Sequence, residues 1–505
     1  MKSIKEIAAS LWANRVARSY RRKQRTAVED QRKWFRRIMN RGAKTAFGRD
    51  FGLGEVRNIE DFQKRVPLAD YERYRPYIQR IIDGESDVLW PGRPLYFAKT
   101  SGTTSGTKYI PITRESMPYH VKAARDMLLL YIHKAKQTDF INGKMIFLQG
   151  SPVLKKVGGI PTGRLSGIVA HYVPAYLQKN RLPSWETNSI EDWETKVERV
   201  IDETLGQNMT VFSGIPSWIV NYFEKIVERT GKTVGEVFPG FRLFVSGGTA
   251  FEPYRPKFEQ LVGRPVDLLE TYPASEGFMA FSDDYRRRDL LLLTDHGMFY
   301  EFVPVERFFD ENPPRLTLDQ VETGKDYAII LTTHAGLYAY VIGDTVRFTS
   351  TDPYRIVVTG RIKHFISAFG EHVIAKEVEE AMQSAVERFG VRINEFSVAP
   401  QVQPAEGLPY HEWLVEFETA PEDMQAFAAH IDRKMQEQNI YYKDLIDGKI
   451  LRPAVITPVR KGGFAAYMAS EGKLGGQNKV PRLKNDRSLA EKLYRLDLIE
   501  SPKPD

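Results

Sequence analysis

The feature that most restricts the fold of this chain is a series of short apolar runs separated by helical stretches. Stretches with helical periodicity, such as 191–205 and 216–230, lie between several of the runs. The runs are KMIFLQG (144–150), MTVFSG (209–214), FRLFVSGG (241–248), VDLLETY (266–272) and YAIILTT (327–333). Strands that alternate with helices are typical of a largely parallel sheet covered on both faces. We therefore expect a large α/β domain.

The pattern changes near Gly360. Beyond it, helical stretches at 375–389 and 421–438 accompany two apolar runs, HEWLVEFE (411–418) and AVITPV (454–459). This arrangement is typical of a small α+β domain, and a chain of 505 residues is too long for one ordinary core. We expect four segments: basic helices at 1–45, a large domain at 46–358, a hinge at 359–364 and a small domain at 365–505.

The positive charge is concentrated at the N-terminal end. The net charge is +7, but residues 1–45 contain fourteen Lys and Arg and three acids, which leaves −4 for the rest of the chain. Apolar residues at helical spacing, among them Ile4, Ile7 and Leu11, predict one or two amphipathic helices. We expect a solvated basic face on a docked helix, with weak contact to an anionic membrane surface as the alternative. No motif for nucleic-acid binding follows, so no nucleic-acid partner is expected.

Several classes of protein are excluded by what the sequence lacks. Cysteine is absent, which excludes disulfides, thiolate metal sites and a cysteine nucleophile. The nine histidines form neither an HxxxH nor an HExxH pair, so a tight zinc site is not expected. No apolar run reaches the ~18–20 residues of a membrane-spanning helix, and no secretory signal is recognisable. These features predict a cytoplasmic protein.

A loop rich in glycine and hydroxyl residues, TSGTTSGTK (100–108), follows a predicted strand at 95–99. Its backbone N–H groups and hydroxyls can bind an anion, and its glycines permit close approach. It is not a Walker A loop, because three residues rather than four separate Gly102 from Gly106 and Lys108 does not directly follow. By itself the loop fits either a phosphate site or an ordinary polar turn.

Three further segments end predicted strands with residues suited to a nucleotide. They are SGGT (246–249), ETYPASEG (270–277) and YVIGDT (340–345). The two glycines of the first leave bare backbone for a flat ring. Glu276 could hold magnesium, Tyr272 could stack on a base, and Asp344 is suited to ribose hydroxyls. Open α/β sheets bind ligands at the carboxyl ends of strands, so we expect one nucleotide site rather than four separate turns.

The motifs TSGTTSG, SGGT, TYPASE, GLYAYVIGD, GRIKHF and GGQNKVPR occur in an order that resembles the adenylate-forming superfamily. More closely, the chain resembles the Gretchen Hagen (auxin-responsive) family of acyl-acid amido synthetases over nearly its whole length, and SEGF, GRIKHF and GGQNKVPR are similar to bacterial members. The resemblance implies a large N-terminal α/β domain that binds ATP and the acyl substrate. It also implies a smaller, mobile α+β C-terminal domain.

The resemblance further implies roles for individual residues. Glu276 would ligate Mg²⁺, Arg361 would begin the hinge together with Lys363, and Lys479 would reach into the adenylation site. The remaining positions would hold the nucleotide: Ser101, Gly102, Thr103, Thr104 and Ser105 at the phosphates, Gly247, Gly248 and Thr249 along the adenine, Tyr272 and Ser275 in the pocket, and Asp344 at the ribose.

The activity implied by the resemblance has two steps. ATP activates a carboxylic acid as an acyl-adenylate with release of pyrophosphate, and the acyl group then passes to an amino acid or another amine with release of AMP. An acid–CoA ligase would share the first step. A catalytically weak nucleotide- or acyl-binding protein is the other alternative, because Ala339 stands where members usually carry arginine and Pro273 replaces a small or polar residue.

Overall fold

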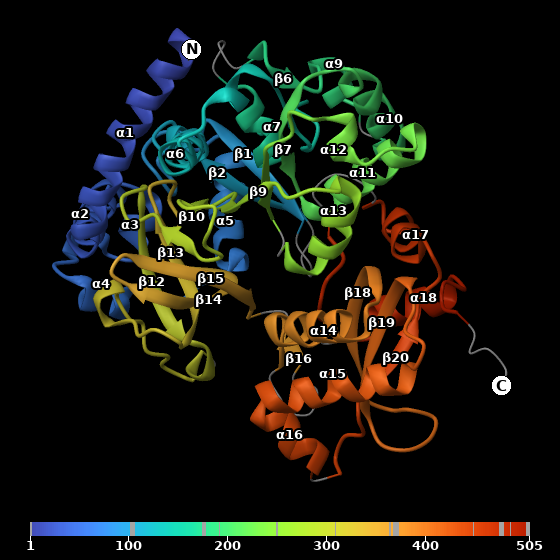
Figure 1. Cartoon of the computed structure of the whole chain (residues 1–505). Helices are drawn as coiled ribbons and strands as arrows, with labels where there is room; N and C mark the ends of the chain where they lie inside the picture. Colours follow the sequence, from blue (N-terminus) through green and yellow to red (C-terminus); the bar gives the residue numbers. More distant parts are fainter. Residues whose placement is uncertain are drawn as a thin grey trace. The chain divides into compact units, whose positions relative to one another are not determined.

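The computed structural model describes residues 3–101, 107–173, 178–190, 192–248, 251–308, 310–362, 365–366, 373–447, 449–473, 479–484 and 486–500 (Figure 1). The chain folds into two compact units. The large unit comprises Met1–Thr249 and Leu261–Val358, and the small unit comprises Ala250–Gln260 and Thr359–Asp505. The boundary after Val358 lies close to Gly360, where the sequence pattern changes.

Half of the main sheet of the large unit is parallel. Five strands run parallel in the order β6 (Arg181–Leu182), β3 (Lys144–Phe147), β7 (Met209–Gly214), β8 (Leu243–Gly247) and β9 (Asp267–Ala274). Parallel neighbours require a crossover, so α10 (Trp193–Thr204) leads to β7 and α11 (Pro216–Thr230) leads to β8. Each of the first four apolar runs overlaps one of these strands, as predicted.

Helix α11 shows how the sequence positions a covering helix. It begins with Pro216, whose missing N–H would have no partner in the first turn, and ends at Gly231 in the left-handed conformation (φ +67°). Its buried side chains recur at helical spacing, as at Trp218, Tyr222 and Ile226, and the helix packs against β7. One apolar face therefore covers the parallel strands.

The rest of the main sheet corrects the expectation of a largely parallel sheet. Strands β9, β10 (Gly277–Phe281), β11 (Leu290–Leu292) and β15 (Tyr354–Arg361) pair antiparallel in sequence, and so do β12 (Met298–Pro304), β13 (Asp326–Thr333) and β14 (Tyr340–Thr351). β13 is buried at every position after Asp326. An antiparallel strand covered on both faces has the same continuous apolar run as a parallel one, so the sequence pattern could not separate them.

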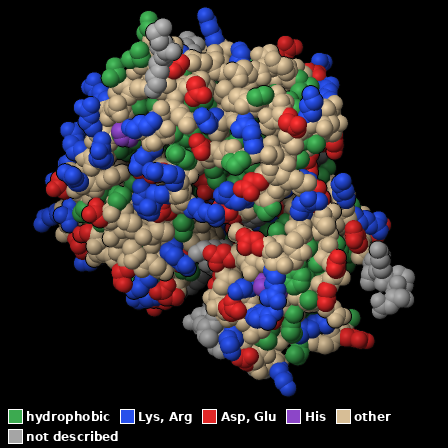
Figure 2. Space-filling view, viewed as in Figure 1, with side chains coloured by type: hydrophobic (Ala, Val, Ile, Leu, Met, Phe, Trp, Pro, Cys, Tyr) green, Lys and Arg blue, Asp and Glu red, His purple; other side chains and the backbone are tan. Residues whose placement is uncertain are grey.

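The basic N-terminal segment folds as two helices of the large unit, α1 (Ile4–Arg25) and α2 (Ala27–Gly42). Ala13, Val16 and Tyr20 form the buried face of α1, which packs against α6 (Met117–Ala135). Lys and Arg side chains cover the outer side of both helices, on the left of the view in Figure 2. No helix in the described part of the chain is long and apolar enough to cross a membrane.

A second sheet of the large unit carries the glycine- and hydroxyl-rich loop. Its order is β2 (Thr107–Ile112), β1 (Tyr96–Ser101), β5 (Ile160–Gly163) and β4 (Lys155–Val157). β1 and β2 pair antiparallel from Tyr96 with Ile112 to Ser101 with Thr107. The loop therefore connects two paired strands instead of leading into a helix, which is a further difference from a Walker A loop.

The small unit is built on the strands β18 (Arg392–Gln401), β19 (Tyr410–Thr419) and β20 (Val455–Pro458). Helices α14 (Ala375–Phe389) and α15 (Met424–Gln438) contribute to its core, where Trp413 is fully buried. Residues 250–260 join this unit through contacts far along the chain: Tyr254 Oη donates to Glu395 Oε2 at 3.2 Å and Lys257 pairs with Glu418. The mixture of helices and strands agrees with the expected α+β character.

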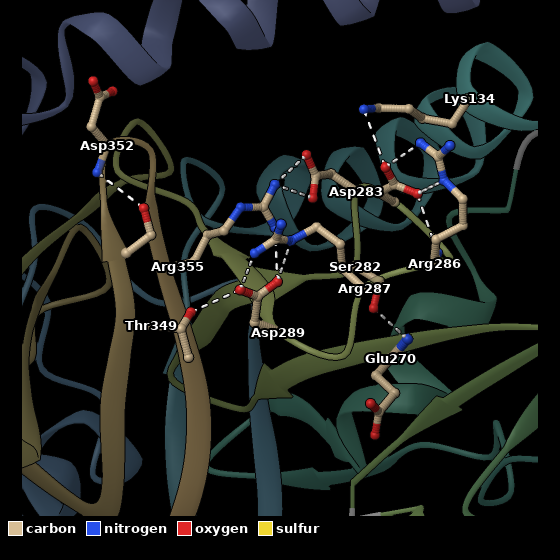
Figure 3. Close-up of polar contacts among 12 residues, drawn as sticks. Lys134, Glu270, Ser282, Asp283, Arg286, Arg287, Asp289, Thr349, Asp352 and Arg355 are labelled. Atoms are coloured by element: carbon tan, nitrogen blue, oxygen red, sulfur yellow. Dashed lines mark hydrogen bonds and ion pairs between the residues drawn. The ribbon is translucent and has the colours of Figure 1, made fainter. Parts of the chain in front are cut away.

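A buried ion network fixes the antiparallel half of the large unit (Figure 3). Arg355, on β15, pairs with Asp283 at 2.8 Å and with Asp289 at 3.2 Å, and all three side chains are largely buried. Burial alone would raise the pKa of Asp289, but hydrogen bonds from Arg287 and Thr349 and the charge of Arg355 outweigh it and lower the pKa to about 2. The network joins β15 to the turn between β10 and β11.

We predict that Arg355→Met lowers the free energy of unfolding of the large unit at pH 7 by about 3–5 kcal/mol, because it removes the cation that pairs with buried Asp283 and leaves Asp289 with Arg287 and Thr349 only. The lowered pKa of Asp289 means that its contribution is present above the unfolded value of 3.8 and is lost as the pH falls toward 2. The difference in free energy of unfolding between wild type and Arg355→Met should therefore decrease as the pH falls from 3.8 toward 2. Urea unfolding at pH 7 and at pH 3 measures both effects.

The control is Arg286→Met, which removes the exposed partner of Asp284 and should cost less than about 1 kcal/mol. Equal losses in the two variants, or a deficit for Arg355→Met that does not change with pH, would show that the network does not stabilise the unit in this way.

Candidate active site

The end of β8 exposes backbone without side chains. Gly247 is its last residue, and a Cβ there would lie 2.4 Å from the hydroxyl oxygen of Thr271 on the neighbouring strand β9. Gly248 follows with a φ of +90°, which favours glycine. Ser246, just before them, is fully buried, and its hydroxyl has no hydrogen-bond partner among the described residues. The close approach of Thr271 therefore requires glycine at position 247, while the exposed backbone of Gly248 and the unpartnered hydroxyl of Ser246 fit a flat, polar ligand.

Tyr272, on β9, contacts Asp344, on β14. The hydroxyl of Tyr272 donates to Asp344 Oδ2 at 2.7 Å, and Tyr272 is only 8% exposed. Because the donor is buried and its partner is a carboxylate, the bond restricts the orientation of both side chains. Two residues that the sequence assigned separately to a nucleotide pocket are thus brought together, and this contact defines the centre of the candidate site.

Asp344 does not end a strand, which corrects one prediction. β14 begins at Tyr340 and continues to Thr351, so Asp344 lies within it. The register against β13 shifts here: Val341 pairs with Ile330 but Thr345 pairs with Ala328, so extra residues bulge from β14. Gly343, with a φ of +91°, permits that bulge, and in the sequence the Gly-Asp pair therefore resembled a turn.

Ala339 occupies the turn before β14. It is fully buried and has a φ of +47°, which is unusual for a residue other than glycine. Its amide donates to Thr332 Oγ1 at 2.9 Å, and its carbonyl accepts from the amide of Ala69 at 3.1 Å. The position where arginine was expected therefore holds a small residue in a tightly packed turn.

Ser275 and Glu276 form the turn between β9 and β10, in which Gly277 pairs with Ala274. Both are half-buried. Pro273 lies within β9 opposite Phe278, so the second departure from the family pattern is accommodated in the strand. Burial and then the negative charge of Glu276 raise the pKa of Tyr340, which places this carboxylate near the start of β14.

Tyrosines that the sequence pattern did not indicate connect these elements. Tyr71 begins α5 (Tyr71–Ile82), and its hydroxyl accepts from the amide of Tyr109 on β2 at 2.9 Å. Lys108 lies 5.6 Å from the centre of the Tyr71 ring. A tyrosine repeat at helical spacing in YERYRPYIQRII was visible in the sequence, but nothing there associated it with β2 or β14.

Several predicted residues fall outside the described part of the chain. They are Gly102, Thr103, Thr104, Ser105, Thr249 and Lys363. Ser101 is described only as the last residue of β1. The two predicted residues of the small unit that the structure describes are both exposed: Arg361 ends β15, and Lys479 follows the undescribed residues 474–478. Within that unit, Lys479 and Arg482 oppose the rise that burial causes in the pKa of Glu379.

The described carboxylates fit a magnesium ion only together with other ligands. No cluster of three or more His, Asp or Glu side chains suited to a metal occurs in the described ranges. Mg²⁺ is typically held by one or two carboxylates together with substrate phosphates and water. Glu276, in a turn beside the other site residues, suits that arrangement.

Comparisons with known proteins agree with this fold. The chain matches the GH3 family N-terminal domain over residues 17–198, the central domain over 291–361 and the C-terminal domain over 376–488. The solved structure of GH3.15 acyl acid amido synthetase superposes with a TM-score of 0.79 at 18% identity, covering 99% of this chain and 98% of that one. A 2-hydroxyisobutyryl-CoA ligase in the postadenylation state, with 2-HIB-AMP, gives a TM-score of 0.58 at 12% identity over 94% and 92%.

Curated relatives are similar at low identity over most of their length. Jasmonoyl--L-amino acid synthetase GH3.5 of Oryza sativa subsp. japonica is 23% identical over 91% of this chain and 93% of its own. Indole-3-acetic acid-amido synthetase GH3.3 of Arabidopsis thaliana is 22% identical over 90% and 88%.

The fold is the mixed α/β fold of the adenylate-forming enzymes, with several sheets. Within that class, the chain belongs to the GH3 family, because the three matched domains span most of its length. GH3 acyl acid amido synthetases are enzymes that adenylate an acid with ATP and conjugate it to an amino acid.

We predict that Tyr272→Phe weakens the binding of ATP with Mg²⁺ roughly 10- to 100-fold, because it removes a hydrogen bond to a carboxylate in the candidate site. Isothermal titration calorimetry measures the Kd. The matched control is Tyr77→Phe, which removes a hydrogen bond of the same 2.7 Å length from Tyr77 to Asp50 in the same unit. Equal affinities in the two variants would contradict a role for Tyr272 in the site.

Proposed function

We propose that this chain is an ATP-dependent ligase that activates a carboxylic acid as an acyl-adenylate and transfers the acyl group to an amino acid or another amine. The observation that carries the proposal is the contact of Tyr272 with Asp344, next to the turn that holds Glu276, in a member of the GH3 family. Cytoplasmic location and membership of the bacterial type stay predictions of the sequence.

The chemistry explains why these groups are needed. A carboxylate oxygen attacks the α-phosphorus of ATP, and the bond from that phosphorus to the oxygen bridging to the β-phosphate breaks, so pyrophosphate leaves. The amine nitrogen then attacks the acyl carbonyl carbon, AMP leaves, and the nitrogen releases a proton. The first step brings an anion to a polyanion, so its barrier is mainly electrostatic. Mg²⁺ held by Glu276 would offset part of that charge.

We expect wild-type protein with ATP and Mg²⁺ to exchange labelled pyrophosphate into ATP when the matching carboxylic acid is present. Adding amino acids should then yield AMP and an amide, detected by mass spectrometry. Acyl-CoA formed with no amide would indicate an acid–CoA ligase instead. ATP binding without exchange over a broad panel of aliphatic and aromatic acids would support the binding-protein alternative.

The proposal assigns Lys479 to the first step only. A lysine is a compact charge on a long flexible stem, suited to reach an oxyanion, and Lys479 is exposed between the undescribed residues 474–478 and Pro481. Movement of the small domain about residues 359–364 would deliver this ammonium group during adenylation and withdraw it for attack by the amine.

Lys479→Ala should therefore reduce pyrophosphate exchange ~100- to 1000-fold, the effect of losing one preorganised charge contact of roughly 3–4 kcal/mol. The same variant should still convert a chemically supplied acyl-adenylate to the amide. Lys461→Ala, which removes another exposed lysine of the small unit, is the control and should leave both reactions unchanged. Equal damage to both half-reactions would refute the alternating role.

A further inference from the structure

Three cationic side chains gather at the carboxyl end of β3, outside the residues assigned so far. Lys196, on α10, is 3% exposed, and its ammonium group donates to the carbonyls of Gln149 at 3.0 Å and Asn188 at 2.8 Å. Gln149 lies two residues beyond the end of β3. Lys196 is thus bonded to the loop that follows this strand.

The other two cations approach the same two loop residues. Arg181, on β6, donates to the side-chain oxygen of Gln149 in the amide orientation that satisfies Gln149, and to the carbonyl of Ala170 at 3.3 Å. Arg164 packs over Gly150 so closely that a Cβ there would lie 2.7 Å from Arg164 Cδ. All three cations therefore converge on Gln149 and Gly150.

None of these cations has a counter-ion among the described residues. Within those ranges, Arg164, Arg181 and Lys196 form no ion pair, and the guanidinium of Arg164 makes no hydrogen bond. Burial lowers the pKa of both arginines, and burial together with the charge of Arg164 lowers the pKa of Lys196 to about 8. Carbonyl groups offset the loss of water but not the mutual repulsion of three like charges. Such a cluster is stabilised when an anion binds.

The cluster lies on the ligand-binding side of the sheet. β3, β7 and β8 are adjacent parallel strands, so their carboxyl ends meet at one edge. The loop after β3 is two strand spacings, or about 10 Å, from the end of β8 at Gly247. That separation suits the far end of a substrate whose other end reacts beside the candidate nucleotide site.

We propose that Arg164, Arg181 and Lys196 form a subsite for a carboxylate of the substrates. The inference rests on the proposed function and names the class of molecule that its site takes. The guanidinium of Arg164 can bind a carboxylate in a bidentate manner, and Lys196 retains one of its three N–H donors. The carboxylate comes either from the distal end of a dicarboxylic acyl substrate or from the amino-acid acceptor.

Pyrophosphate exchange separates the two sources, because it requires no acceptor. For the first source, wild-type protein should have a lower KM for adipate than for hexanoate. Arg164→Gln and Lys196→Met should each raise the KM for adipate about tenfold or more and leave that for hexanoate unchanged. For the second source, both variants should leave exchange unchanged. They should instead raise the KM for the amino acid about tenfold, with no effect on the corresponding amino-acid amide.

Lys156→Met, on the exposed strand β4, is the control with an equal loss of charge, and Arg164→Lys should restore part of the lost affinity. Equal KM changes for adipate and hexanoate, or no change with any substrate, would overturn the subsite and leave the three cations a structural role.

Calorimetric titration with adipate or an amino acid, in the absence of turnover, tests the subsite separately from the reaction. In one outcome, wild-type protein binds adipate or an amino acid, Arg164→Gln abolishes that binding, and yet no acid supports pyrophosphate exchange. That result would refute the proposed function but not the anion subsite. The subsite, but not the function, would be refuted by one combination of results. In that case the protein exchanges pyrophosphate with hexanoate, has no lower KM for adipate, and binds neither adipate nor an amino acid in the calorimeter.

Discussion

The candidate site depends on how the start of β14 is held by the chain between residues 69 and 74. The amide of Ala69 donates to the carbonyl of Ala339, and the amide of Val341 donates back to the carbonyl of Ala69 at 2.9 Å. The hydroxyl of Tyr74 accepts from the amide of Tyr338 at 2.8 Å and donates to its carbonyl. These bonds satisfy the backbone of a buried turn and maintain its positive φ. Asp344 lies on β14, the strand that begins directly after this turn.

The large unit contains buried cations of two kinds, one with acidic partners and one without described acidic partners. Arg355 is buried with Asp283 and Asp289, so its charge is compensated within the fold, and the arrangement serves structure. Arg164, Arg181 and Lys196 are buried or half-buried without described acidic partners; carbonyl groups accept hydrogen bonds from Arg181 and Lys196, and none is described for the guanidinium of Arg164. A fold that leaves such a cluster uncompensated beside its ligand-binding edge gives binding energy to an incoming anion.

The proposed two-step reaction would explain why the proposed site residues are distributed over two units. The large unit holds the residues that can orient a nucleotide, while Lys479 belongs to a unit that also includes residues 250–260. An acyl-adenylate must be protected from water in one step and opened to an amine in the next. In the proposed mechanism, the group needed only for adenylation, Lys479, is carried on the smaller unit.

The sequence by itself determined most of the strands and helices, because apolar periodicity depends on neighbouring residues. The runs at 209–214 and 327–333 are strands, and residues 216–230 form a helix, as the pattern predicts. It also predicts one site for Tyr272, Glu276 and Asp344, because their segments follow predicted strands, and the contact of Tyr272 with Asp344 agrees with that prediction. Only the tertiary structure decided that half of the sheet is antiparallel, since buried strands of either direction have the same pattern. Likewise, only the tertiary structure associated Arg164 with Lys196, because single cations 32 positions apart have no motif and their missing counter-ion is a property of the packed interior.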